Sequence, residues 1–105
     1  MRFVETTIFT RALRALVPDD DYRALQMALM LRPEQGALIR GSGGLRKIRW
    51  GGSGRGKRGG IRVIYYWDDG KEAFYMLLTY AKNDQEDLTP SQLRFLGRLV
   101  REEFE

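Results

Sequence analysis

The sequence of 105 residues contains no cysteine and no histidine. Without cysteine the chain cannot form a disulfide framework, a thiolate zinc site or a cysteine nucleophile, and this fits a reducing compartment. Without histidine it lacks the only side chain whose ordinary pKa lies near neutrality, and also a common metal ligand. Proton transfer would therefore need lysine, tyrosine, a carboxylate or the substrate itself, and we expect no cofactor and no metal.

Long apolar runs are also missing. No stretch approaches the roughly 18 residues that a bilayer-spanning helix needs, and residues 1–5 lack the charged-then-apolar layout of a signal peptide. We therefore expect a cytoplasmic protein with no membrane partner. Apolar residues make up 43% of the chain, enough for a core, and the length fits one domain over residues 1–105.

Positive charge is concentrated in one segment. Residues 40–62 contain eight Lys and Arg and no acid, whereas the rest of the chain has ten Lys and Arg against fourteen Asp and Glu. Ten of the twelve glycines lie between Gly36 and Gly60. Such a concentration of positive charge and glycine in one segment indicates a binding surface for a polyanion.

The apolar spacing predicts two helices before residue 33, which would form a hairpin. The first is expected to end at Pro18, and its apolar positions are Ile8, Ala12, Leu13, Leu16 and Val17. The second is expected to begin with Asp19 as N-cap and to end at Pro33. Its apolar face is formed by Tyr22, Leu25, Ala28 and Leu29.

Four strands are expected, one at the start of the chain and three after residue 44, where the apolar period changes to two. The expected strands cover residues 3–6, 45–50, 61–68 and about 73–82, with Asp69-Gly70 as a hairpin signal in which Gly70 takes a positive φ. Residues 51–60 are too rich in glycine for either helix or strand.

A final helix has a clear start signal. Thr89 is the expected N-cap, Pro90 the first helical residue, and Gln92 completes a capping box. The apolar face of this helix is formed by Leu93, Leu96, Leu99, Val100 and Phe104. The resulting order β-α-α-β-β-β-α predicts an α+β fold, a helical hairpin packed on a small, mainly antiparallel sheet.

The glycine-rich basic segment favours a polyanion with repeated phosphates. Glycine lets backbone amides approach phosphate, and Arg and Lys supply the charge. The run from Gly54 to Gly60 lacks the Gly-Lys-Ser/Thr ending of a P-loop and precedes a strand, which argues against nucleotide hydrolysis. A solubilising surface loop is the alternative.

Aromatic residues on the neighbouring strands could stack on unpaired bases. Strand alternation places Val63 and Tyr65 on one face of residues 61–68, and Arg62 and Tyr66 on the other. We expect Val63 to be core and Arg62 to point away from it, so that truncation of Arg62 leaves the fold intact. Tyr66 and Tyr80 are the candidates for stacking.

Three runs together resemble the HigB branch of the RelE/ParE superfamily of toxins. They are Gly43-Gly44-Leu45-Arg46-Lys47-Ile48-Arg49, Gly54-Arg55-Gly56-Lys57-Arg58-Gly59-Gly60-Ile61-Arg62-Val63-Ile64-Tyr65-Tyr66 and Tyr80-Ala81-Lys82-Asn83. With the helical hairpin before them and the capped helix after them, the resemblance covers essentially the whole chain. It implies the RelE-like microbial RNase fold.

The resemblance implies a type II toxin that cuts messenger RNA on the ribosome and so inhibits translation. Its partner would be an antitoxin, often with a helix-turn-helix, and operator DNA would be bound only through the toxin–antitoxin complex. In such toxins an Arg that matches Arg62 faces the scissile phosphate, and basic residues that match Lys47, Arg49 and Lys82 surround it. Some relatives have Arg in place of Asn83 and Tyr near Thr89, which leaves the general acid open.

The chemistry of RNA agrees with this set of residues. RNA carries its own nucleophile, the 2′-hydroxyl, so clustered cations that stabilise the phosphorane suffice without metal. We assign transition-state charge to Arg62, and Lys57 and Lys82 are competing base candidates because a lysine among other cations loses its proton more readily. The expected contacts to RNA are Arg46, Lys47, Arg49, Arg55, Arg58, Asn83, Tyr66 and Tyr80.

Two other functions remain open at this point. A ParE-like toxin shares the fold and poisons DNA gyrase without cutting RNA, although it would not need a convergent cationic site. A non-catalytic RNA-binding module would need the same cations as a nuclease.

Overall fold

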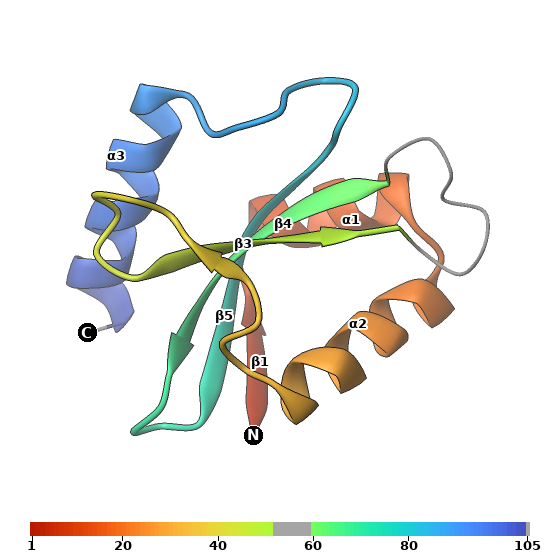
Figure 1. Cartoon of the computed structure of the whole chain (residues 1–105), viewed down its shortest axis with the longest axis horizontal. Helices are drawn as coiled ribbons and strands as arrows, with labels where there is room; N and C mark the ends of the chain where they lie inside the picture. The colour runs from red at the N-terminus through yellow and green to blue at the C-terminus, as the bar shows by residue number, and fades with distance from the viewer. Residues whose placement is uncertain (52–59, 105) are drawn as a thin grey trace.

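The computed structural model describes residues 1–51 and 60–104, which form one mixed sheet with helices on both faces (Figure 1). The sheet order is β1-β5-β4-β3-β2, with β1 parallel to β5 and the other neighbours antiparallel. In chain order the elements are β1 (Arg2–Glu5), α1 (Thr7–Leu16), α2 (Asp19–Leu31), β2 (Ala37–Leu38), β3 (Leu45–Trp50), β4 (Ile61–Asp68), β5 (Ala73–Ala81), α3 (Pro90–Leu99) and a π-helical turn, η1 (Val100–Phe104). The predicted α+β class and mainly antiparallel sheet are confirmed. The prediction missed β2, whose two residues are too few to show a period.

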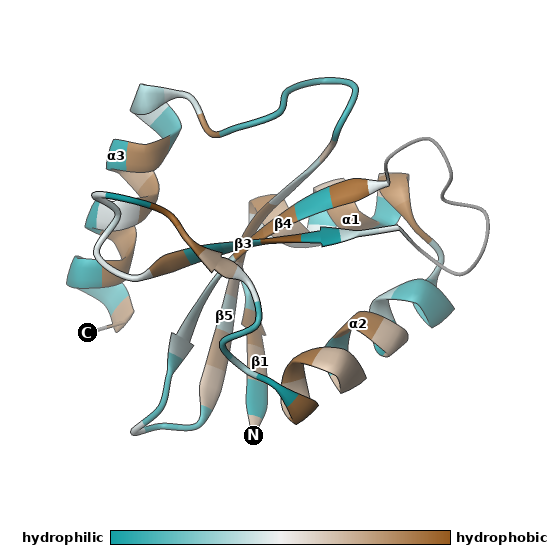
Figure 2. Cartoon of the chain, in the orientation of Figure 1, coloured by the Kyte–Doolittle hydropathy of each residue, from teal (hydrophilic) through white to brown (hydrophobic). Residues whose placement is uncertain are grey.

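Each face of the sheet carries its own apolar core because side chains alternate along β3, β4 and β5. Figure 2 shows apolar and polar bands following one another along β3 and β4. Val63 and Tyr65 pack under α1 and α2, whereas Ile64 packs under α3 and η1. A side chain on β4 that points away from the hairpin therefore points into a second covered face.

The hairpin differs from the prediction at two positions. Ile8 is 53% exposed and Phe9 is fully buried, because α1 turns Phe9 and Leu13 toward the sheet. Asp19 is the first residue of α2 and not its N-cap. Pro18, which is extended at φ −69° and ψ 159°, occupies the cap position.

The turn between β4 and β5 also differs from the prediction. The positive φ of 50° is at Glu72, and Gly70 is not among the positive-φ residues. The connection is longer than a two-residue loop, with the amide of Glu72 donating to the carbonyl of Asp69 at 3.2 Å. This turn places its left-handed residue at the last position before β5.

The start of α3 follows the sequence signal closely. The Thr89 hydroxyl accepts from the amide of Gln92 at 3.1 Å, and the Gln92 side chain accepts from the amide of Thr89 at 3.0 Å. The predicted capping box is thus confirmed. Leu96 and Val100, on the inner face, are buried in the second core.

We predict that Thr89→Ala lowers the free energy of unfolding by about 1 kcal/mol, because one helical amide loses its cap. A denaturant melt measures the change, and Thr89→Ser, which keeps a hydroxyl, serves as the control. An unchanged midpoint for Thr89→Ala would mean that the capping box does not hold the helix start.

None of the helices in the described part of the chain has the length and apolar character needed to cross a membrane.

Candidate nucleic-acid interface

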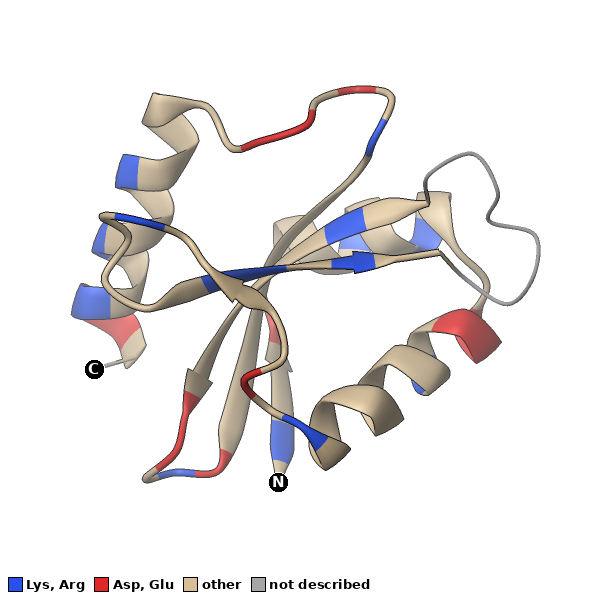
Figure 3. Ribbon diagram, viewed as in Figure 1, with Lys and Arg blue, Asp and Glu red and all other residues tan. Residues whose placement is uncertain are grey.

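Three cations lie next to one another on the face of the sheet that α3 covers. Arg49 of β3 pairs with Arg62 of β4, and Arg62 pairs with Tyr80 of β5. Lys47 lies two residues before Arg49, on the same face. Directly paired residues have Cβ atoms about 5 Å apart, so Arg49 and Arg62 are close neighbours. We call Lys47, Arg49 and Arg62 the cation row. Figure 3 shows the blue positions of β3 and β4 side by side.

Arg62 is the buried member of this row. Only 3% of its surface is exposed, so the prediction that its truncation leaves the fold intact has to be checked on the variant itself. Strand alternation does point it away from Val63, but the face it points to is covered as well. Its guanidinium Nη2 lies 3.1 Å from a carboxylate oxygen of Glu86.

The carboxylate partners of the cation row come from the acidic segment Asp84–Asp87, which follows β5. Besides the Glu86 pair, the carboxylate of Asp87 forms an ion pair with the ammonium of Lys47. The ammonium of Lys47 lowers the pKa of the Asp87 carboxyl, through a hydrogen bond and through its charge. The main-chain carbonyl of Glu86 accepts hydrogen bonds from Lys47 at 3.5 Å and from the Tyr80 hydroxyl at 3.4 Å.

The sequence prediction did not single out the acidic segment. Its signal was present, since Asp84-Gln85-Glu86-Asp87 directly follows the expected site residues Lys82 and Asn83. These carboxylates are the part of the site that the sequence reasoning overlooked.

Lys82 and Asn83 lie at the same end of the sheet as Arg62. The amide of Lys82 donates to the carbonyl of Gly60 at 3.2 Å, which holds the end of β5 beside the start of β4. Both Lys82 and Asn83 are exposed. Three further expected site residues, Arg55, Lys57 and Arg58, lie outside the described residues.

Arg46 and Tyr66 do not join the cation row. The Arg46 guanidinium donates to the carbonyls of Glu34 at 2.9 Å and Gly36 at 2.8 Å, and so it fixes the turn after α2. Tyr66 is four residues beyond Arg62 along β4, about 13 Å away at the usual rise per residue. Its ring packs near Tyr75, with the centroids 6.2 Å apart.

Tyr80 pairs with Arg62 beside the cation row but is 7% exposed, so its ring offers little surface for a base to stack on. Burial raises the pKa of its hydroxyl, and the charge of Asp87 raises it further. The hydroxyl therefore stays protonated and acts as a hydrogen-bond donor toward Glu86.

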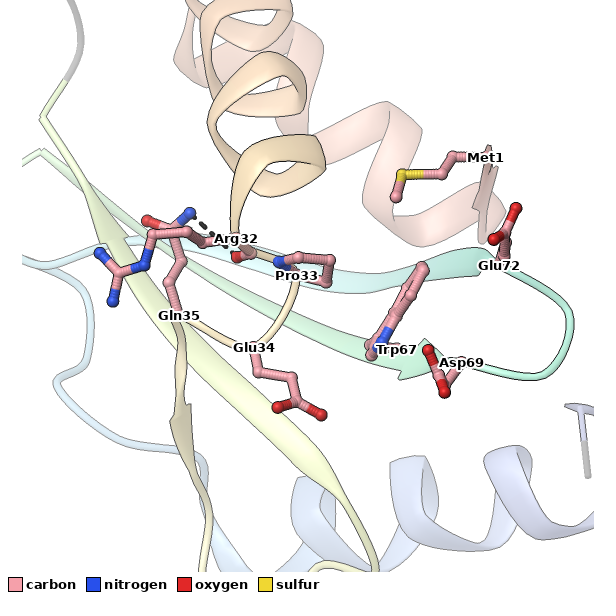
Figure 4. A pocket seen from close by; sticks show the side chains of 8 residues that line it. All are labelled: Met1, Arg32, Pro33, Glu34, Gln35, Trp67, Asp69 and Glu72. Atoms are coloured by element: carbon pink, nitrogen blue, oxygen red, sulfur yellow. Dashed lines mark hydrogen bonds between the residues drawn. The ribbon is translucent and has the colours of Figure 1, made fainter.

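A pocket of about 530 Å³ lies near the β4–β5 turn, beyond the far end of β4 from Arg62 (Figure 4). Trp67 lines it together with the carboxylates of Glu34, Asp69 and Glu72. Such carboxylates repel phosphate, so this pocket does not suit RNA. The cation row, in contrast, brings together side chains whose charge suits a nucleic acid.

Two comparisons with known proteins agree with each other. A sequence model of the family described as the RelE toxin of the RelE/RelB toxin–antitoxin system matches residues 1–103. The structure is similar to that of a mutant of the Escherichia coli toxin RelE in the free state, with a TM-score of 0.53 at 18% sequence identity. The match covers 80% of this chain and 85% of the E. coli chain, and at that identity it demonstrates a shared fold. The chain therefore belongs to the RelE toxin family of toxin–antitoxin systems.

Proposed function

We propose that this chain is a toxin that cleaves messenger RNA on the ribosome and is neutralised by a cognate antitoxin. The observation that carries the proposal is the cation row: the strand register sets Lys47, Arg49 and Arg62 side by side on one face. Clustered cations of this kind bind successive phosphates and stabilise the charge that develops at one of them. Membership of a toxin family supplies the antitoxin as partner.

The proposed reaction uses the RNA as its own nucleophile. The 2′-oxygen attacks the adjacent phosphorus, the bond to the 5′-oxygen breaks, and a 2′,3′-cyclic phosphate and a 5′-hydroxyl result. A base removes the 2′ proton, and an acid protonates the leaving 5′-oxygen. Arg62 stabilises the pentavalent phosphorane, Lys82 or Lys57 serves as base, and Lys47 and Arg49 hold the flanking phosphates.

The finer assignments belong to the same proposal. We place the chain in the HigB branch, as one toxin domain over residues 1–105 in the cytoplasm. Its antitoxin carries a helix-turn-helix, and operator DNA is bound through the toxin–antitoxin complex. The mechanism uses neither metal nor cofactor, because the RNA provides the nucleophile and the side chains provide the charge.

We predict that RNA binding weakens steeply with salt. If four or five cations contact phosphates, the slope of log K against log salt is about −3 for a single strand. Titration of a short single-stranded RNA, with a 2′-O-methyl backbone that prevents cleavage, measures this slope. Arg49→Ala should make this slope shallower by about 0.7, because one phosphate contact is lost.

The matched control for this titration is Arg98→Ala. Arg98 is exposed on α3, where it lines a pocket with Arg94 and Arg101 and with no member of the cation row, and its removal changes the net charge by the same amount. It should leave the slope almost unchanged. A wild-type slope near zero would rule out binding to a polyanion.

A further inference from the structure

Arg62, the residue proposed to stabilise the transition state, is inaccessible in the free protein. Its side chain is 3% exposed, whereas Glu86, its partner at 3.1 Å, is 51% exposed. The carboxylate thus lies on the solvent side of the guanidinium. A phosphate cannot approach Arg62 from that side while the Glu86 carboxylate is in place.

Lys47 and Asp87 repeat this arrangement. The Lys47 side chain is 22% exposed and the Asp87 side chain is 74% exposed, so the acid again lies outside the cation. These are the two ion pairs found among residues 1–51 and 60–104. Both use a cation of the row and an acid of the segment 84–87.

We propose that Glu86 and Asp87 occupy, in the free protein, the positions that RNA phosphates take in the complex. RNA must displace both carboxylates to bind, so the free toxin carries an inhibitory contact within its own chain. This inference rests on the proposed function, since it takes RNA as the polyanion.

Displacement requires the two side chains to rotate, and the backbone of the segment stays where it is. The Gln85 side chain donates to the carbonyl of Asp87 and to the Gln92 side chain, both at 2.9 Å. Leu88 packs into the core beside α3. Besides the hydrogen bond from Lys47 to the carbonyl of Glu86, the segment is therefore fixed to the fold by contacts that do not involve the cation row.

Such a contact favours long anions over small ones. A single phosphate ion gains little when it replaces one carboxylate, because it only exchanges one ion pair for another. A strand of RNA displaces both carboxylates with phosphates that are already linked, so the second replacement is effectively intramolecular. The contact thus selects for linked phosphates.

Neutralisation of the acids tests the inference. Glu86→Gln and Asp87→Asn keep the shape of each side chain and remove its charge. We expect Asp87→Asn to raise the affinity for a 2′-O-methyl single-stranded RNA by about 1.5- to 5-fold, the range for an exposed ion pair. Glu86→Gln should raise it at least as much, because its partner Arg62 is buried. In the double variant the salt slope should stay near the wild-type value, because the number of phosphates neutralised in the complex is the same and only the affinity changes.

Asp84→Asn is the matched control. Asp84 lies in the same segment, is exposed, and belongs to neither ion pair. It removes one negative charge, as each test variant does, so any rise in RNA affinity that it produces measures the effect of net charge alone. Asp87→Asn also guards against misfolding, because its partner Lys47 is less buried than Arg62.

The outcomes separate the two claims. If the wild type binds RNA and both test variants bind no more tightly than Asp84→Asn, the inhibitory contact does not exist and the proposed function stands. If they bind more weakly, the acids organise the site and do not block it. If no variant binds RNA and the wild type shows no salt dependence, the proposed function falls and this inference falls with it.

Discussion

Arg62→Ala should lower the rate of RNA cleavage by about 10²- to 10³-fold, the loss typical of removing one preorganised charge from a developing anion. Arg62 is paired in register with Arg49 on one side and with Tyr80 on the other. The rate is measured in single turnover on ribosomes carrying messenger RNA. Binding of RNA should fall far less than the rate, because only one phosphate contact is lost.

The variant needs a check of its fold, since Arg62 is 3% exposed. Its main-chain carbonyl, which accepts from the Thr79 hydroxyl at 2.9 Å, is unaffected by truncation. A thermal melt and binding to the antitoxin establish that the variant is folded. Arg62→Lys keeps the charge and loses the planar fork, so it should recover part of the rate. A loss below tenfold in a folded Arg62→Ala protein would exclude Arg62 from the chemistry.

Gly60→Ala should lower the free energy of unfolding by about 2–5 kcal/mol, because it combines a left-handed backbone with overpacking. Gly60 has a φ of +59°, and a Cβ there would lie 2.3 Å from the carbonyl oxygen of Trp50 and 2.7 Å from the Cα of Gly51. These are backbone atoms that cannot rotate away. The close approach joins the ends of β3 and β4, where Arg49 and Arg62 lie. A denaturant melt measures the change.

Gly43→Ala separates the two causes. Gly43 has a φ of +79°, and a Cβ there would meet nothing within 4 Å. It should therefore cost only the conformational part, about 1–2 kcal/mol. Equal losses at Gly43 and Gly60 would show that the approach of the Gly60 backbone to Trp50 does not matter for stability.

Much of the fold could be predicted because local signals and tertiary structure agree. The bounds of β3 and β4 match the alternating runs 45–50 and 61–68, and the capping box fixes the start of α3. The prediction failed where tertiary packing shifted the buried face of a helix by one residue. In α1, Phe9 faces the sheet and Ile8 is exposed. The apolar periodicity of a single helix does not reveal on which side of the helix the sheet lies.

The candidate site could be predicted only in part. Lys47, Arg49 and Arg62 come together because strand alternation, which the sequence shows, and the register of β3 with β4, which the structure shows, place them side by side on one face. The same alternation puts Arg46 on the opposite face, where it binds the turn after α2. The burial of Arg62 and its pairing with Glu86 could not be predicted, since they depend on how the segment after β5 folds back over the sheet.

Primer extension on messenger RNA tests the central claim most directly. Cells that express the wild-type chain without antitoxin should stop growing and should show new 5′ ends within messenger RNA. Cells that express Arg62→Ala should keep growing and show none. Growth arrest by the wild type without new messenger RNA ends would contradict the nuclease and would favour a poison of DNA gyrase on the same fold.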